Sequence, residues 1–370
     1  MNLEDRVESC RTRAAAWLDS MVLEPGRPER VRFSSFHDPD RWPGMLLPAA
    51  YDAIHCRILL GSWRPEDSAR AVDYLNGFQD ADGAYRLPGM RPDSVYKGPD
   101  PERTREYVDL HATNYAWGAV RSLGGRERFR PAFLDRHLTP EGFAEWTSRR
   151  DWDDPWMEGN LVVNLGSFIV SWAEDGDVRA AACLPELFAW LDGIQDEATG
   201  FWGTRMESRR DILEAMAGAM HTYHLYYRTG REPRHLDRIA EHCISLARDE
   251  LRPVTSACLD VDIVDVLANV HRLGLRRKEI EGILEEKLEL LLDFQNPDGG
   301  FPDERGGILR FDGWVGGYWE PQGRSNCFAT WFRCAAVAVA SCILFPHTAS
   351  TWKFRDTVGI GYYRNDRKAL

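Results

Sequence analysis

Residues 291–304 read LLDFQNPDGGFPDE, an amphipathic segment that ends at a glutamine and is followed by an acidic glycine turn and an aromatic residue. The same order of residues occurs in LNGFQDADGAYRLP (75–88) and in LDGIQDEATGFWGT (191–204). The copies are about a hundred residues apart, which is roughly twice the length of a helical hairpin. The spacing therefore predicts a chain of hairpins with a weaker copy in each interval, near Trp146 and near Leu246.

Two kinds of segment alternate along the chain, and both have the spacing of apolar residues that is typical of helices. The first kind is apolar and rich in small residues, and five of its six members end at glycine, which readily closes a helix. These six are 45–61, 108–125, 157–176, 212–230, 256–274 and 324–345. The second kind carries more charge and comprises 65–79, 177–195, 233–250 and 278–295. We expect the apolar segments to form an inner layer and the charged segments an outer layer.

The ends of the chain complete this arrangement. The last apolar segment has no charged partner after it, and the amphipathic N-terminal segment 1–22 can supply one. The sequence therefore predicts an all-α fold, an (α/α)6 toroid in which six helical hairpins form a closed ring. We expect residues 1–370 to form a single domain, with 345–370 as a C-terminal tail that packs on it.

Composition narrows the possible partners and the compartment. The formal net charge is −12 and no long Lys/Arg block occurs, which argues against nucleic acid or an anionic membrane as the main partner. No apolar run approaches the roughly 18 residues that span a bilayer, and the N-terminus lacks the apolar core of a signal peptide. The eight cysteines are dispersed without a CxxC pair, as expected of buried thiols in a reducing compartment. We therefore expect a cytoplasmic protein, and the sequence gives no oligomeric state.

Each apolar segment begins with polar residues spaced so that they lie on one side of a helix. One interpretation is that they are helix caps or satisfied buried groups. However, a stack of apolar helices has no need of six polar groups at one end, so we expect them to line a ligand cavity. The set comprises Asp52, His55, His111, Asn114, Glu158, Asn160, Asn164, His221, His224, Asp260, Asp262, Asp265, Arg324 and Asn326.

Aromatic residues accompany these polar groups. The stretch FDGWVGGYWEPQG (311–323) has no helical period, so we expect a loop wall that offers rings to a sugar face or to a cation. From this stretch and the inner segments we expect Trp156, Tyr223, Trp314, Trp319 and Glu320 to bind substrate. Other aromatics expected near the site are Trp42, Tyr51, Tyr107, Tyr115, Trp202 and Tyr318.

The Gln-x-x-x-Gly-aromatic turns resemble the repeats of the terpenoid cyclase and protein prenyltransferase superfamily, whose members share the (α/α)6 toroid. In class II terpene cyclases an Asp-x-Asp-Asp motif begins an inner helix, and its middle Asp protonates an alkene. Here Asp260-Val261-Asp262 begins an inner segment, but Ile263 stands where the family has Asp, and the third acid is Asp265. The resemblance implies that Asp262 is the catalytic acid in the cyclisation or isomerisation of an isoprenoid.

The chemistry of these residues is consistent with that role. A carboxyl protonates an alkene only if burial and neighbouring carboxylates keep it protonated. The negative charges of Asp260 and Asp265 can have that effect on Asp262. His221 or His224 could orient the acid, which completes the expected catalytic set. We expect no cofactor, and Mg²⁺ only if the substrate is a diphosphate. The zinc-binding Asp-x-Cys pair of the prenyltransferases has no match, because Asp312-Gly313-Trp314 lacks the cysteine, so we expect no metal.

Two alternatives remain open on the sequence alone. Polysaccharide lyases and hydrolases also use the toroid, and an intracellular glycan enzyme would use Asn or Arg against a uronate carboxylate, or two carboxylates such as Glu158 and Asp262 for hydrolysis. The other alternative is a toroid that binds a ligand without chemistry. An enclosed apolar cavity around Asp262 would favour the cyclase, and an open aromatic groove would favour the glycan enzyme.

Overall fold

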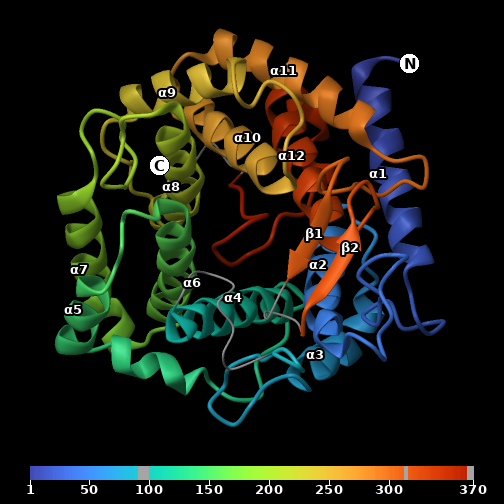
Figure 1. Ribbon diagram of the computed structural model, residues 1–370, viewed down its shortest axis with the longest axis horizontal. Helices are drawn as coiled ribbons and strands as arrows, with labels where there is room; N and C mark the ends of the chain where they lie inside the picture. Colours follow the sequence, from blue (N-terminus) through green and yellow to red (C-terminus); the bar gives the residue numbers. More distant parts are fainter. Residues whose placement is uncertain (91–99, 312–315, 365–370) are drawn as a thin grey trace.

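The computed structural model describes residues 1–90, 100–311 and 316–364, and it is mostly helical. The apolar segments form the inner helices α2 (Leu46–Leu59), α4 (Pro101–Ser122), α6 (Pro155–Glu174), α8 (Arg209–Thr229), α10 (Ala257–Arg272) and α12 (Cys327–Leu344). Each of these helices contacts the next one, and α12 contacts α2. The inner helices thus follow one another around a ring (Figure 1).

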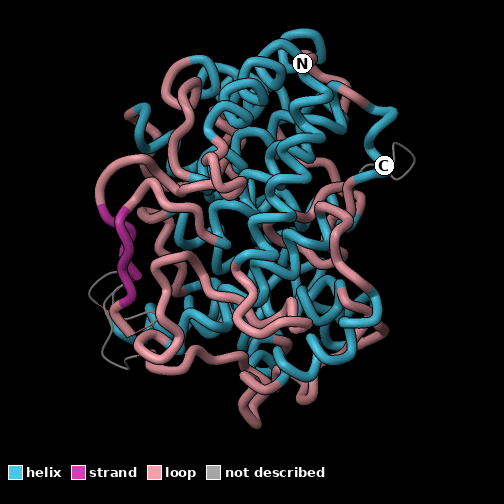
Figure 2. Tube along the Cα trace, turned by 90° about the vertical axis from the view of Figure 1, so that its right-hand side faces the viewer, coloured by secondary structure: helices cyan, strands magenta, loops and turns pink. Residues whose placement is uncertain are grey.

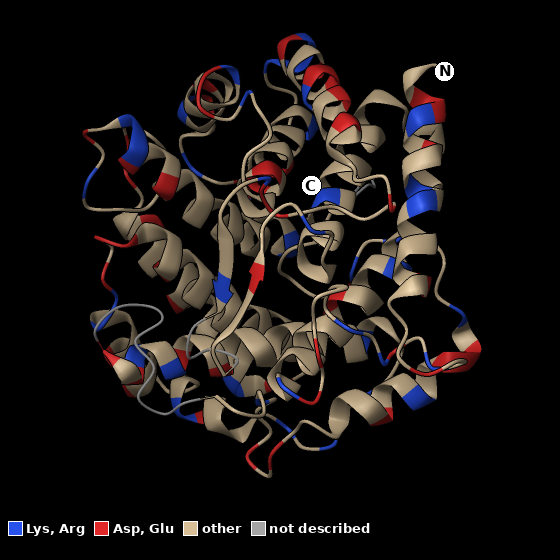
Figure 3. Ribbon diagram, turned by 45° about the vertical axis from the view of Figure 1, so that its right-hand side comes forward, with Lys and Arg blue, Asp and Glu red and all other residues tan. Residues whose placement is uncertain are grey.

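The outer helices are α1 (Leu3–Ser20), α3 (Ser68–Asn76), α5 (Pro140–Ser148), α7 (Val178–Ile194), α9 (Leu236–Arg248) and α11 (Arg277–Phe294). They carry many of the charged residues, whereas the inner helices are mostly uncharged (Figure 3). Helix α1 contacts α11, α12 and α2, and Arg6 of α1 forms a 2.6 Å ion pair with Asp293 of α11. The N-terminal helix therefore occupies the place in the outer layer that follows α12.

The repeated glutamines connect the end of an outer helix to another segment of the chain through side-chain hydrogen bonds. The side-chain amide of Gln79 donates to the carbonyl of Gly83 in its own turn and to the carbonyl of Phe129 after α4. Gly83 has a φ of +85°, and a Cβ there would lie 2.2 Å from the carbonyl oxygen of Arg130, so only glycine fits. The other glutamines repeat both bonds, Gln195 to the carbonyls of Gly200 and Arg234, and Gln295 to those of Gly299 and Cys10.

One local expectation is wrong. The stretch that we expected to be a loop wall begins with the last residue of β1 (Ile308–Phe311) and contains all of β2 (Tyr318–Pro321), and these strands pair antiparallel with Phe311 opposite Tyr318. The strands lie at one face of the molecule (Figure 2). In β2 the side chains of Tyr318 and Glu320 are buried in alternation, a pattern too short to recognise among so many glycines. Trp314 lies outside the described residues.

Helix α12 is apolar and long enough to cross a membrane, the one such helix in the described part of the chain. However, 83% of it is buried inside the molecule, and it contacts α2, α10 and α11. Because its neighbours account for its hydrophobicity, α12 has the character of a core helix.

The chain after α12 returns to the ring. A short 3-10 helix, Pro346–Thr351, packs on α12, and residues 352–364 then enter the middle of the ring, where Figure 1 shows the chain in red. Val358, Ile360, Tyr362 and Tyr363 are buried there. This C-terminal segment, residues 352–364, therefore belongs to the core.

Candidate active site

A cavity of about 300 Å³ lies toward the N-terminal ends of the inner helices, and all six helices contribute to it. Its wall is largely aromatic, and no Lys or Arg is among the described residues that line it. The lining residues are Phe33, Met45, Pro48, Tyr51, Asp52, Tyr107, His111, Tyr115, Asp154, Trp156, Met157, Asn160, His221, Cys258, Asp262, Phe311, Phe328 and Phe332. A cavity of this size is at the lower end of the range for small-molecule sites.

Asp262 is the most unusual group in this wall. Its side chain is buried, and neither carboxyl oxygen has a hydrogen-bond partner among the described residues. Burial raises the pKa of Asp262 well above its usual value, and the nearby carboxylates of Asp265 and Asp260 raise it further. Asp262 is therefore a neutral carboxylic acid that faces an apolar cavity and has a proton to give.

Asp260 has a different environment, although it is only two residues away. Lys287 of α11 lies 2.6 Å from one carboxylate oxygen, and Arg333 of α12 donates to the other. Arg333 also donates to the backbone carbonyls of Thr255, Pro302 and Asp303. Asp260 does not line the cavity. Asp260 therefore has a structural role, because this ion pair joins the start of α10 to α11 and α12, and it acts on Asp262 only through its charge.

Asp265 faces the neighbouring inner helix. Its Oδ1 lies 3.0 Å from Nε2 of His224 on α8 and accepts a hydrogen bond from Asn269. Neither Asp265 nor His224 lines the cavity. Their contact with the site is therefore indirect, through the charge that Asp265 places near Asp262.

His221 does line the cavity, as expected. Burial lowers its pKa to about 3, and the nearby His224 and His111 lower it in the same direction. Its Nδ1 has no hydrogen-bond partner in the described part of the chain. His221 is consequently a neutral imidazole at physiological pH.

Asp52 is the second buried carboxyl of the wall. It lies on α2 and is 3% exposed, and burial raises its pKa well above the usual value. With Asp262 it gives the cavity two neutral acids that can donate hydrogen bonds. The third carboxyl, Asp154, is half exposed and caps α6 by accepting from the backbone N–H of Met157.

Several expected lining residues are turned away from the cavity. His55 stacks on Trp331 with ring centroids 4.7 Å apart, and Asn114 donates to Asn164 at 2.8 Å. Tyr223 donates to the carbonyl of Gly200 in the second glutamine turn. Glu158 forms ion pairs with Arg103 of α4 and with Arg150. None of the four lines the cavity, and each has a structural partner.

The hairpin residues also have structural partners. The carboxylate of Glu320 accepts from Ser34, Tyr318 and Asn326, and Asn326 also caps α12 through the N–H of Ala329. Trp319 packs on Phe36 at 5.1 Å, and Arg324 lies over the same ring. These contacts hold the hairpin beside the cavity. Of its described residues, only Phe311 lines the cavity wall.

Some of the other expected residues line the cavity, whereas Trp42, Trp202 and Tyr318 do not, and the sequence missed part of the wall. Trp156, Asn160 and His111 line the cavity as expected, together with Tyr51, Tyr107 and Tyr115. The missed residues are mainly apolar: Phe33, Met45, Phe311, Phe328 and Phe332. Phe328 and Phe332 are four residues apart on α12, a spacing that signals a common helix face but is equally typical of core packing.

Comparison with known proteins supports the fold. No family model matches the chain, and no curated protein matches it. A polysaccharide lyase is similar in structure, with a TM-score of 0.50 at 12% identity, over 94% of this chain and 99% of that chain. A variant of the type II terpene cyclase MstE from Scytonema, in complex with geranylgeranyl dihydroxybenzoate, has a TM-score of 0.45 at 14% identity, over 94% and 98%. The chain thus has a mostly helical fold of the toroid type, and its chemistry must be argued from its own residues.

Proposed function

We propose that this chain is an enzyme of six helical hairpins that cyclises or isomerises an isoprenoid-type substrate by protonating it from Asp262. The observation that carries the proposal is the buried carboxyl of Asp262, which has no partner among the described residues and faces an aromatic cavity. A buried acid without a partner is costly for stability. Such a cost is typical of a catalytic group rather than a structural one.

In this reaction the Asp262 carboxyl gives its proton to one carbon of a substrate double bond, and the other carbon becomes a cation. Asp262 is then a carboxylate. The faces of Tyr115, Trp156 and Phe332 stabilise the cation electrostatically as it forms new bonds. Loss of a proton from the cation ends the reaction, and a proton returned to Asp262 restores the enzyme. No redox partner is required.

The residues that line the cavity also bear on the two alternative functions, a glycan enzyme and a binding protein. A uronate lyase needs a cation or amide to neutralise the substrate carboxylate, yet Asn114 and Arg324 lie outside the cavity and Asn160 donates to the backbone of its own helix. A hydrolase pair of Glu158 and Asp262 is not favoured, because Glu158 does not line the cavity and is paired with Arg103. A binding protein would use Asp262 only as a hydrogen-bond donor to its ligand, and product analysis distinguishes that role from catalysis. The aromatic enclosure therefore favours a hydrocarbon over a glycan.

The first test is product analysis by mass spectrometry. The purified protein is incubated with linear prenyl diphosphates and with polyprenes, with and without Mg²⁺, because Mg²⁺ is expected to matter only for a diphosphate. We expect cyclic or isomerised products from the parent protein. In Asp262→Asn, which keeps the shape and removes the acid, these products should be lost.

The matched control is Asp154→Asn. Asp154 is a carboxyl of the same cavity, and asparagine preserves its capping of α6. This variant should retain activity. If no isoprenoid is converted by the parent protein, or if Asp262→Asn is as active as the parent, the proposal is wrong.

A further inference from the structure

The C-terminal segment, residues 352–364, contacts the inner helices from within the ring. The backbone N–H of Lys353 donates to the carbonyl of Leu59 on α2, and Ser167 of α6 donates to the carbonyl of Val358. Tyr362 lies against His224 of α8, with ring centroids 5.8 Å apart. The segment therefore crosses the ring from α2 toward α8.

These contacts lie at the end of the ring opposite the cavity mouth. Leu59 is the last residue of α2, whereas Pro48 and Asp52 near its beginning line the cavity. At the far side Arg364 reaches the carbonyl of Arg228, close to the end of α8. Thus the segment closes the ring from the C-terminal ends of the inner helices, while the substrate cavity opens at their N-terminal ends.

The segment is held firmly by a buried arginine. The guanidinium of Arg355 donates to Thr357 and lies 5.3 Å from the ring centroid of Tyr115, a cavity residue. A Cβ on Gly118 would lie 2.1 Å from this guanidinium, so α4 leaves room for it. Arg355 is buried and has no carboxylate partner among the described residues. Its guanidinium is therefore held by neutral groups such as the hydroxyl of Thr357.

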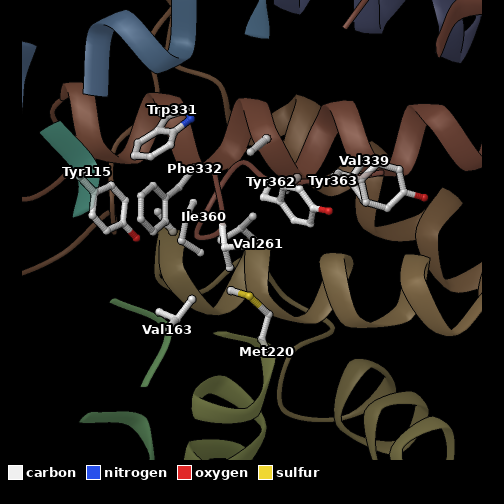
Figure 4. Packing of buried hydrophobic residues seen from close by; sticks show 14 of the residues in the cluster. Tyr115, Val163, Met220, Val261, Trp331, Phe332, Val339, Ile360, Tyr362 and Tyr363 are labelled. Carbon is white, nitrogen blue, oxygen red and sulfur yellow. The ribbon is translucent and has the colours of Figure 1, made fainter. Parts of the chain in front are cut away.

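Ile360 is a residue of the segment that lies close to the cavity wall. Figure 4 shows it beside Phe332 and Val261, with Tyr115 close by, and all four belong to one buried cluster. Phe332 and Tyr115 line the cavity, but Ile360 does not. Ile360 thus packs directly behind the wall.

We propose that residues 355–363 support the floor of the substrate cavity from behind and that the side chain of Ile360 sets its depth, so that this segment determines the longest chain the enzyme accepts. The proposal rests on the proposed function only in taking this cavity as the substrate site. Removing side-chain carbons from Ile360 should let Phe332 and Tyr115 move back and lengthen the cavity. Enlarging the side chain should push them forward and shorten it.

The experiment measures cavity length without requiring turnover. Straight-chain primary alcohols from octanol to hexadecanol are titrated into the protein, and binding is followed by calorimetry and by the fluorescence of Trp156 and its neighbours. Affinity should rise about fourfold for each added methylene until the chain reaches the floor. The variants are Ile360→Ala and Ile360→Phe. The control is Ile280→Ala, a fully buried truncation of the same size on the outer helix α11.

We expect the length at which affinity stops rising to increase by about two methylenes in Ile360→Ala and to decrease in Ile360→Phe. It should stay unchanged in Ile280→Ala, even if that variant is equally destabilised. An unchanged break point in both Ile360 variants would overturn the proposal, and so would the absence of any alcohol binding. Asp262→Asn should bind the alcohols as the parent does. A failure of the proposal on cavity depth is therefore distinguishable from a failure of the proposed chemistry.

Discussion

The carboxyl of Asp262 on α10 and the imidazole of His221 on α8 share one cavity wall, and neither has a hydrogen bond to a described residue. Burial keeps both groups uncharged, raising the pKa of Asp262 and lowering that of His221 to about 3. The site therefore combines a proton donor and an unprotonated base in an apolar space.

The pH dependence of the reaction follows from these two pKa values. Asp262 must be protonated to act. The activity of the enzyme is therefore present at low pH and is lost as the pH rises through the raised pKa of Asp262. His221 is already neutral above pH 4, because its pKa is about 3. We therefore expect kcat/KM to show a single descending limb with no ascending limb between pH 5 and 8. An ascending limb near the ordinary histidine pKa of about 6.5 would contradict this account.

Asp262→Asn should make the protein more stable at neutral pH. The raised pKa of Asp262 means that the folded protein binds a proton that the unfolded chain releases above pH 4, so stability falls as pH rises from the unfolded value through the folded value. Asparagine does not ionise and avoids this loss. We expect a Tm a few degrees above the parent at pH 7 by calorimetry, and no difference below pH 4. An equal or lower Tm at pH 7 would show that folding does not raise the pKa of Asp262.

The features that could be predicted from the sequence are those encoded locally. The ends of α3, α7 and α11 follow from Gln79, Gln195 and Gln295, because the same short segment contains the helix end, the turn and the buried aromatic residue. The position of Asp262 follows from its place at the start of an inner helix. These inferences need only the spacing of neighbouring residues.

The orientation of each polar side chain around the ring was not predictable in the same way. His55 and Asn114 have the spacing of cavity residues, yet they face Trp331 and Asn164 on adjacent helices. The rotation of an inner helix about its axis is set by both neighbouring helices, which lie far apart in the sequence. The same reason hides the path of residues 352–364, whose buried positions depend on contacts with helices hundreds of residues earlier.

Gln79→Leu should destabilise the protein by about 2–3 kcal/mol. The substitution removes bonds to the carbonyls of Gly83 and Phe129 and to the N–H of Phe129, and each unmade bond costs about 1 kcal/mol. Urea denaturation measures the loss. Gln322→Leu is the control, because that amide accepts a single bond, from the exposed backbone N–H of Glu304. Equal effects of the two substitutions would show that the glutamine turns do not hold the hairpins together.

Asp260→Ala should be far more damaging, although Asp260 does not reach the cavity. It leaves the buried cations of Lys287 and Arg333 without their carboxylate, and breaking such a pair costs about 3–5 kcal/mol. Asp293→Ala removes the exposed partner of Arg6 and should cost less than about 1 kcal/mol. Urea denaturation compares the two. If Asp260→Ala were as stable as Asp293→Ala while activity was lost, Asp260 would belong to the chemistry, and its assignment as an anchor for α10 would be wrong.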